Sequence, residues 1–285
     1  MTLGAERAAG QILYVSDSTH SEVWAVAADG SFSTYASGFN IPEGLASDTN
    51  GDLFVANGGN GTISEVMAGG ASGSTFASGL TQPFGLVMNS TGYLFVAEAG
   101  TAKAIAEISP LGSVSTFVSG LGSNPAGLAF DSSGNLYVSL ANGKVDEVTP
   151  GGTVSTFVTG MSTPRGVAFD SNGNLYVVNN GNSTISEVTP GGSASTFAAT
   201  GGFMTGLAIN GTNYLYTPGN VAGDAQVVRF TPGGSSTTFA DFDLAQLTYA
   251  TFAVPEPADY TLAAGLAALG VAAWRRRGRR SSRSS

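Results

Sequence analysis

The tripeptide Leu136-Tyr137-Val138 belongs to a unit that repeats along the chain. Its copies begin at leucines that are 40, 41, 42, 39 and 40 residues apart, and the last copy has Thr in place of Val. The six copies are Leu13-Tyr14-Val15, Leu53-Phe54-Val55, Leu94-Phe95-Val96, Leu136-Tyr137-Val138, Leu175-Tyr176-Val177 and Leu215-Tyr216-Thr217. A constant period of this length is typical of repeat architectures in which every unit is one supersecondary structure.

The fourth unit shows what one repeat contains. Four short runs rich in apolar, β-branched and aromatic residues cover 126–130, 135–139, 144–148 and 153–158. Turn residues separate them, such as Gly134 in 131–134 and Pro150 in 149–152. This pattern predicts a four-stranded antiparallel meander. Meanders repeated at this period predict a β-propeller, in which each unit is one blade.

The two ends of the repeat region predict that the ring closes. The first unit begins at its second strand, Ile12 to Ser16, and the run Leu244 to Ala250 follows the last unit. A late strand that completes an early blade removes two free sheet edges. We therefore predict an all-β, six-bladed β-propeller over 11–254, preceded by a disordered segment 1–10 and followed by a tail 255–285.

The composition limits the functions that the propeller can have. Residues 1–254 carry a net charge of −13 and residues 255–285 a net charge of +4. An acidic body repels nucleic acid, so we expect no nucleic-acid partner. The chain has no cysteine and a single histidine, His20, for which no spacing pattern supplies a nucleophile. We predict no catalytic residue, and we assign the recurring aromatics, such as Phe117 and Phe157, to the core.

The stretches 164–170 and 173–177 resemble the NHL-repeat propellers and the neighbouring gluconolactonase-like family. The first resemblance implies a binding protein, and the second a lactone hydrolase with a divalent metal held by Glu, Asn and Asp at the starts of innermost strands. The matching positions here are Glu43, Phe84, Ala126, Arg165, Thr205 and Ala245. Glu43 fits this ligand set, whereas Arg165 brings a positive charge that disfavours a cation. We expect no cofactor, with a divalent metal at Glu43 only under the hydrolase alternative.

Two sets of residues are candidates for ligand binding. Glu43 and Arg165 fall three units apart, on opposite sides of the channel, where they would recognise an anionic or zwitterionic ligand or remain a solvated pair. The second set ends the second strands and would line one face of the ring. Its members are Asp17, Asn57, Glu98 and Asn179. The alternative role for the second set is turn capping by short polar side chains.

The tail has three elements in order. Pro255-Glu256-Pro257 precede an uncharged stretch to Trp274, and a cluster that includes Arg275, Arg276 and Arg277 follows. This order resembles the PEP-CTERM sorting signal of Gram-negative bacteria. The resemblance implies an apolar helix over 258–274 in the inner membrane, an exosortase-type processing enzyme as partner, and release to the cell envelope or surface. Arginines after the span favour a cytoplasmic end.

Three functions remain open from the sequence. The first is an exported, surface-associated and non-catalytic propeller, a monomer that binds a polysaccharide or an envelope protein. The second is the metal-dependent sugar-lactone hydrolase, and the third is a purely structural surface protein. Export requires a signal peptide, and residues 1–10 contain no apolar h-region. Either the leader is missing from this chain or the tail is vestigial, and we expect the first.

Overall fold

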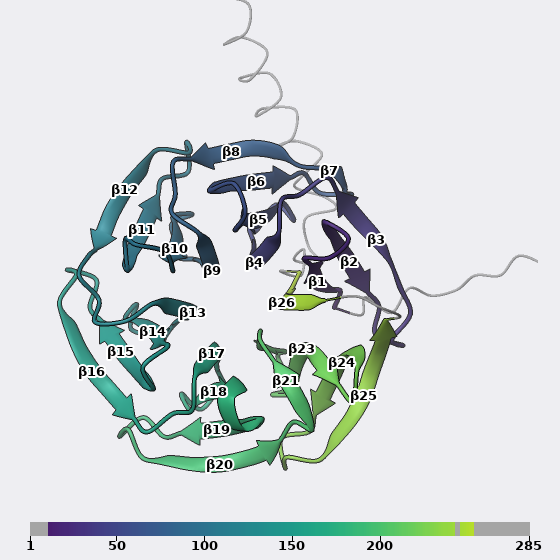
Figure 1. Cartoon of the computed structure of the whole chain (residues 1–285), viewed down its shortest axis with the longest axis vertical. Helices are drawn as coiled ribbons and strands as arrows, with labels where there is room; N and C mark the ends of the chain where they lie inside the picture. The colour runs from purple at the N-terminus through teal and green to yellow at the C-terminus, as the bar shows by residue number, and fades with distance from the viewer. Residues whose placement is uncertain (1–10, 243–245, 254–285) are drawn as a thin grey trace, which may run out of the picture.

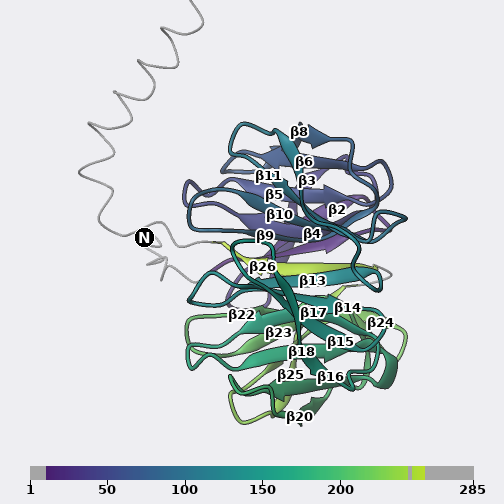
Figure 2. The ribbon, with the colours of Figure 1, turned by 90° about the vertical axis from the view of Figure 1, so that its left-hand side faces the viewer.

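The computed structural model describes residues 11–242 and 246–253. Within this part, β-strands form six sheets, which are arranged as blades around a central axis, as Figure 1 shows. Seen from the side in Figure 2, the sheets stack around the ring with their strands running across its thickness. The predicted six-bladed all-β propeller of four-stranded antiparallel blades is confirmed.

The strands of a blade follow one another from the channel outwards. The first two blades are β26 (Leu247–Phe252), β1 (Leu13–Asp17), β2 (Glu22–Val26) and β3 (Phe32–Ser37), then β4 (Pro42–Ser47), β5 (Leu53–Asn57), β6 (Thr62–Val66) and β8 (Ser74–Ser78). The third and fourth are β9 (Pro83–Met88), β10 (Leu94–Glu98), β11 (Ala104–Ile108) and β12 (Val114–Val118), then β13 (Pro125–Phe130), β14 (Leu136–Leu140), β15 (Lys144–Val148) and β16 (Val154–Thr159). The fifth is β17 (Pro164–Phe169), β18 (Leu175–Asn179), β19 (Thr184–Val188) and β20 (Ala194–Ala199).

The sixth blade departs from this regularity. Its innermost strand is split into β21 (Gly202–Met204) and β22 (Ala208–Ile209), which both pair with β23 (Leu215–Val221). The blade is completed by β24 (Asp224–Phe230) and β25 (Ser236–Phe242). Two small elements lie outside the meanders. They are β7 (Ala71–Ser72), parallel to β3, and the 3₁₀ helix η1 (Asn180–Asn182).

The ring is closed by β26, the last described strand. It pairs antiparallel with β1, with Leu13 opposite Phe252 and Val15 opposite Ala250. The Ala253 N–H also donates to the Ile12 carbonyl over 2.9 Å. The predicted closing strand is therefore present, but it covers 247–252 rather than 244–250. Because β26 supplies the innermost strand of the first blade, neither blade at the junction leaves an open edge.

Aromatic side chains connect the strands and the blades. In the fourth blade, the Tyr137 ring meets Phe157 of its own outermost strand edge-on, with centroids 4.9 Å apart. The same ring meets Phe169 of the next blade at 4.9 Å. Phe95 contacts Phe117 and Phe130 in the same way. Edge-to-face contacts of this kind stabilise a core beyond the area they bury, and they confirm that the recurring aromatics belong to the core.

The predicted segments at both ends of the chain, including Pro255-Glu256-Pro257, the helix over 258–274 and Arg275 to Arg277, lie outside the described residues. Among residues 11–242 and 246–253, no helix has the length and apolar character needed to cross a membrane.

Candidate binding face

One face of the ring gathers all the residues predicted to bind a ligand. We call it the entry face, because each innermost strand begins there, as β4 does at Pro42, and each second strand ends there, as β5 does at Asn57. The opposite face, which carries the turns between first and second strands, is the exit face. Pairing of Pro42 with Asn57 places the two predicted sets at the same level of the ring.

The channel at the entry face is lined by one position per blade, which is the second residue of the innermost strand in every blade except the sixth, where Thr205 lies between β21 and β22. Val15 pairs with Ala250 as Val55 pairs with Leu45, so Ala250 and Leu45 are equivalent positions. The residues two positions earlier, Thr248 and Glu43, are therefore equivalent too. The sixth position is therefore Thr248, and the assignment to Ala245, which lies outside the described residues, is wrong. This inner ring is Glu43, Phe84, Ala126, Arg165, Thr205 and Thr248.

Buried hydroxyl groups hold the backbone of the two charged members of the inner ring. Ser16 Oγ donates to the Glu43 carbonyl over 2.7 Å, and Ser139 Oγ donates to the Arg165 carbonyl over 2.6 Å. Each serine belongs to the preceding blade, and both are fully buried. These bonds satisfy carbonyl groups on strand edges that have no ladder partner toward the channel. Glu43 and Arg165 are consequently fixed on opposite sides, three blades apart.

Tyr249 closes the channel. In five blades the residue after the inner-ring position is glycine, because a Cβ at Gly44 or Gly85 would lie within 2.2 Å of a neighbouring carbonyl oxygen. In the first blade this residue is Tyr249, which is 6% exposed. Its ring meets Phe84 edge-on at 5.7 Å, and its hydroxyl lies 3.4 Å from the Ala126 carbonyl oxygen across the ring. The channel is thus divided into an entry-side mouth and an exit-side hollow of about 410 Å³.

Glu43 and Arg165 set the electrostatics of this mouth. Burial raises the pKa of Glu43 to about 7, and the Arg165 charge opposes that rise. Glu43 Oε2 is buried and has no hydrogen-bond partner among the described residues. The Arg165 guanidinium lies over the Phe84 ring, with its central carbon 5.0 Å from the ring centroid. Burial also raises the pKa of the Tyr249 phenol, so near neutral pH the mouth carries one fixed positive charge and one titrating carboxyl.

The second predicted set is buried beneath the face. Asp17, Asn57, Glu98 and Asn179 are between 0% and 9% exposed. Asn57 Oδ1 accepts from the Asn40 N–H, Glu98 Oε1 from the Thr81 N–H, and Asn179 Oδ1 from the Ser162 N–H. Each bond reaches the loop that leads into the innermost strand of the same blade. The geometry matches the turn-capping alternative, and we refer to these four residues as the clamp.

The clamp holds four residues of an exposed rim that the sequence did not reveal. In every blade, the residue two positions before the inner-ring residue is exposed. This rim consists of Ile41, Gln82, Asn124, Thr163, Phe203 and Gln246. Ile41, Gln82 and Thr163 have positive φ angles of 51°, 47° and 47°. Residues other than glycine rarely adopt this conformation, and here the clamped N–H of the preceding residue holds them in it. The sequence contains one signal for the rim, because four of its residues directly precede a proline. They are found in Ile41-Pro42, Gln82-Pro83, Asn124-Pro125 and Thr163-Pro164.

A cavity of about 490 Å³ opens at the entry face between the fifth, sixth and first blades. Its lining contains Arg165 of the inner ring and two rim residues, Phe203 and Gln246. Its lining includes Arg165, Asn180, Phe203, Thr205, Asn220 and Gln246. The volume lies within the range of about 300–1,000 Å³ that small-molecule sites occupy. The cavity combines an exposed aromatic ring, amide groups, one hydroxyl and one guanidinium.

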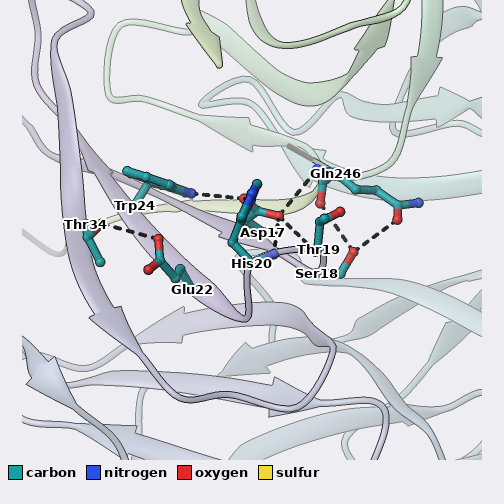
Figure 3. Close-up of polar contacts among 8 residues, drawn as sticks. All are labelled: Asp17, Ser18, Thr19, His20, Glu22, Trp24, Thr34 and Gln246. Carbon is teal, nitrogen blue, oxygen red and sulfur yellow. Dashed lines mark hydrogen bonds and ion pairs between the residues drawn. The ribbon is translucent and has the colours of Figure 1, made fainter. Parts of the chain in front are cut away.

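His20 has a partner that sequence spacing did not identify. As Figure 3 shows, the fully buried Asp17 accepts from the Thr19 N–H at 2.9 Å and from Trp24 Nε1 at 3.3 Å, and its Oδ2 lies 2.7 Å from His20 Nδ1. The Asp17 hydrogen bond and charge raise the pKa of His20. Asp17 also accepts from the Gln246 N–H, so this cluster ties the first blade to the segment that precedes β26.

Comparison with known proteins supports the fold. The NHL repeat family matches residues 161–187, which cover β17, β18 and most of β19. No curated protein matches the chain. A chain in the crystal structure of a nidogen/laminin complex superposes with a TM-score of 0.74 at 16% identity, covering 86% of this chain and 99% of that chain.

Two enzymes share the architecture at similar distance. Virginiamycin B lyase from Staphylococcus aureus superposes with a TM-score of 0.62 at 16% identity, covering 82% of this chain and 84% of that chain. A gluconolactonase from Xanthomonas campestris has a TM-score of 0.64 at 19% identity, covering 73% of this chain and 79% of that chain. At these identities the likeness shows the propeller fold alone.

Proposed function

We propose that this chain is a non-catalytic propeller that binds a polysaccharide on its entry face. The observation that carries the proposal is the exposed rim around a closed channel, with the 490 Å³ cavity beside it. Amide side chains both donate and accept hydrogen bonds, as sugar hydroxyls do. The Phe203 ring, 65% exposed, supplies an apolar platform for a sugar ring. Sharing its fold with a chain of the nidogen/laminin complex is consistent with a binding role.

The proposal is tested by measuring binding of the purified full chain to a panel of extracellular polysaccharides by titration calorimetry. Phe203→Ala and Gln246→Ala should each weaken binding roughly tenfold, since each removes part of the cavity wall. Leu111→Ala is the matched control, because Leu111 is 92% exposed and lies on the exit face. The proposal fails if no polysaccharide binds, or if the exit-face variant weakens binding as much as the cavity variants do.

A metal-dependent lactone hydrolase is the second candidate, favoured by the shared fold with a gluconolactonase and by the place of Glu43 in the channel. Among the inner-ring residues Glu43 is the sole carboxylate, and the described residues contain no group of three His, Cys, Asp or Glu side chains suited to a metal. Hard cations prefer several oxygen ligands, so this donor set fits poorly. Turnover of sugar lactones that requires a divalent ion and disappears in Glu43→Ala would establish the hydrolase instead.

Export to the cell surface completes the proposal. It is supported by the order of Pro255-Glu256-Pro257, the uncharged stretch and the arginine cluster in the sequence. Fractionating cells that produce the full chain or a chain ending at residue 254, each fused behind the same N-terminal signal peptide, tests it. The full chain should pass through the membrane fraction before its body reaches the surface, whereas retention of both chains in the cytoplasm would refute export.

A further inference from the structure

Arg165 carries a positive charge that no described residue neutralises directly. The ion pair found in residues 11–242 and 246–253 joins His20 to Asp17, and it does not involve Arg165. The Arg165 side chain contacts the Phe84 ring, which orients the guanidinium without consuming its N–H donors. Arg165 is also part of the lining of the cavity, and it is the charged residue there. Glu43 faces it from three blades away.

The amides beside Arg165 also present donors. Asn220 Oδ1 accepts from the Gly223 N–H over 3.1 Å, and Gln246 Oε1 accepts from Ser18 Oγ over 3.4 Å. Each amide oxygen is thus engaged within the protein, while the NH₂ groups of Asn220 and Gln246 have no such partner in the described part of the chain. Three side chains of the cavity therefore offer N–H groups, and one of them is charged.

The geometry points to a saccharide that bears a carboxylate, such as a uronic acid unit, as the ligand of this cavity. A guanidinium binds a carboxylate through two parallel N–H···O bonds, which an uncharged sugar cannot match. The Asn220 and Gln246 amides would donate to further ligand oxygens, and Phe203 would contact the ring. In a body with a net charge of −13, selective binding of an anion requires such a local positive site. This inference rests on the proposed function, because it names the class of saccharide that the entry face takes.

The test compares two probes with the same sugar backbone, one with free carboxylates and one with uncharged methyl esters. Binding of a galacturonate oligosaccharide and of its fully methyl-esterified form to the full chain is measured by calorimetry at low salt. We expect the acid to bind more tightly, and Arg165→Gln to weaken its binding roughly 10- to 100-fold, which is the usual effect of removing a charge-assisted hydrogen bond. The ester should be affected by less than about threefold. Arg165→Lys should give an intermediate loss, since it keeps the charge without the planar fork.

Lys103→Gln is the matched control, because it removes the same charge from an exposed entry-face loop that is not part of the cavity lining. Thermal unfolding of each variant verifies that it is folded. Equal binding of the acid and the ester would overturn the inference and leave the proposed function standing. An equal effect of Lys103→Gln and Arg165→Gln would also overturn it, since it would indicate general electrostatics. Absence of binding to both probes, and to the polysaccharide panel, would overturn the proposed function itself.

Discussion

Glu43 is the residue whose protonation couples the site to stability. Its pKa is about 7 in the folded protein and 4.5 when fully solvated, because the partly buried carboxylate is poorly hydrated. Between these values the folded chain binds more protons than the unfolded chain, so stability falls as the pH rises from 4.5 to 7. Above about pH 7 both states are ionised and this contribution no longer changes.

Glu43→Gln should remove this dependence. The variant keeps the size of the side chain but cannot ionise, so its stability relative to the natural chain should improve by on the order of 2–3 kcal/mol between pH 4.5 and pH 8. Urea unfolding at both pH values measures the change. A variant that follows the pH dependence of the natural chain would show that Glu43 does not titrate in this range.

The same residue should make anion binding depend on pH. The charged and titratable groups that face Glu43 are Arg165 on β17 and the Tyr249 phenol on β26, and the raised pKa of Tyr249 keeps it neutral. As the pH rises through about 7, Glu43 gains a charge that repels a bound carboxylate. Affinity for the galacturonate probe should therefore fall from pH 6 to pH 8, and calorimetry of Glu43→Gln should show a smaller change. Affinity that is constant with pH in the natural chain would contradict this.

Asn179 tests the clamp. Its Oδ1 accepts from the Ser162 N–H, and its Nδ2 donates to Ser186 Oγ over 2.8 Å in a buried setting. Asn179→Ala leaves the Ser162 N–H and the Ser186 hydroxyl without this partner, and it should lower the free energy of unfolding by about 1–3 kcal/mol. Asn172→Ala, in an exposed turn, should cost about 0.5 kcal/mol or less. Equal effects in chemical denaturation would show that the clamp contributes little.

At the scale of the element, β26 both closes the ring and fills its centre. Its Thr248 Oγ1 donates to the Pro42 carbonyl over 2.8 Å, which joins the first blade to the second. Its Tyr249 ring stands where the other blades have glycine. The side chains of this one strand therefore determine whether the channel is open. An exact repeat of the other blades would have glycine in place of Tyr249.

Tyr249→Ala should destabilise the protein by about 3–5 kcal/mol, since it leaves a cavity at the centre of the ring. Tyr249→Phe should cost less than about 1.5 kcal/mol, because the hydroxyl bond it removes is long, at 3.4 Å. Denaturant titration compares the two variants. A loss as small in the alanine variant as in the phenylalanine variant would mean that the tyrosine ring is not packed across the channel.

At the scale of the whole molecule, the ring is held together by a junction of non-covalent contacts. Leu13 lies opposite Phe252, and the Ala253 N–H reaches the Ile12 carbonyl. The two ends of the described chain are thus adjacent strands of one sheet. Such adjacency is the condition under which proteins tolerate a change in the order of their elements.

A circular permutant should therefore fold. It would join residue 253 to residue 12 through a short glycine-containing turn and open the chain in the exposed turn at Ser90 and Thr91. Its circular dichroism should match that of residues 11–253, and its thermal midpoint should fall by no more than a few degrees. A control permutant opened inside the fully buried strand β14 should fail to fold. Failure of the first permutant would show that closure depends on chain order.

Much of this architecture could be predicted from local patterns. The runs 126–130 and 144–148 coincide with β13 and β15 to within one residue. The reason is that turn residues and alternating apolar side chains act over a few residues of chain. The clamp was harder to interpret, because Asn57 and Asn179 look the same in sequence whether they cap a loop or face a ligand. Only their burial distinguishes the two roles.

The sequence alone determined the number of blades, the strand pattern within a blade and the closure by a late strand, since each depends on the period of the chain. The tertiary structure decided what lies in the centre. It showed that β26 begins three residues later than expected, which moves Thr248 into the inner ring and Tyr249 across the channel. It also brought Arg165, Asn220 and Gln246 together from three blades. Which residues of different blades lie at one site depends on how the twisted sheets pack around the axis. No local pattern in the chain encodes that geometry.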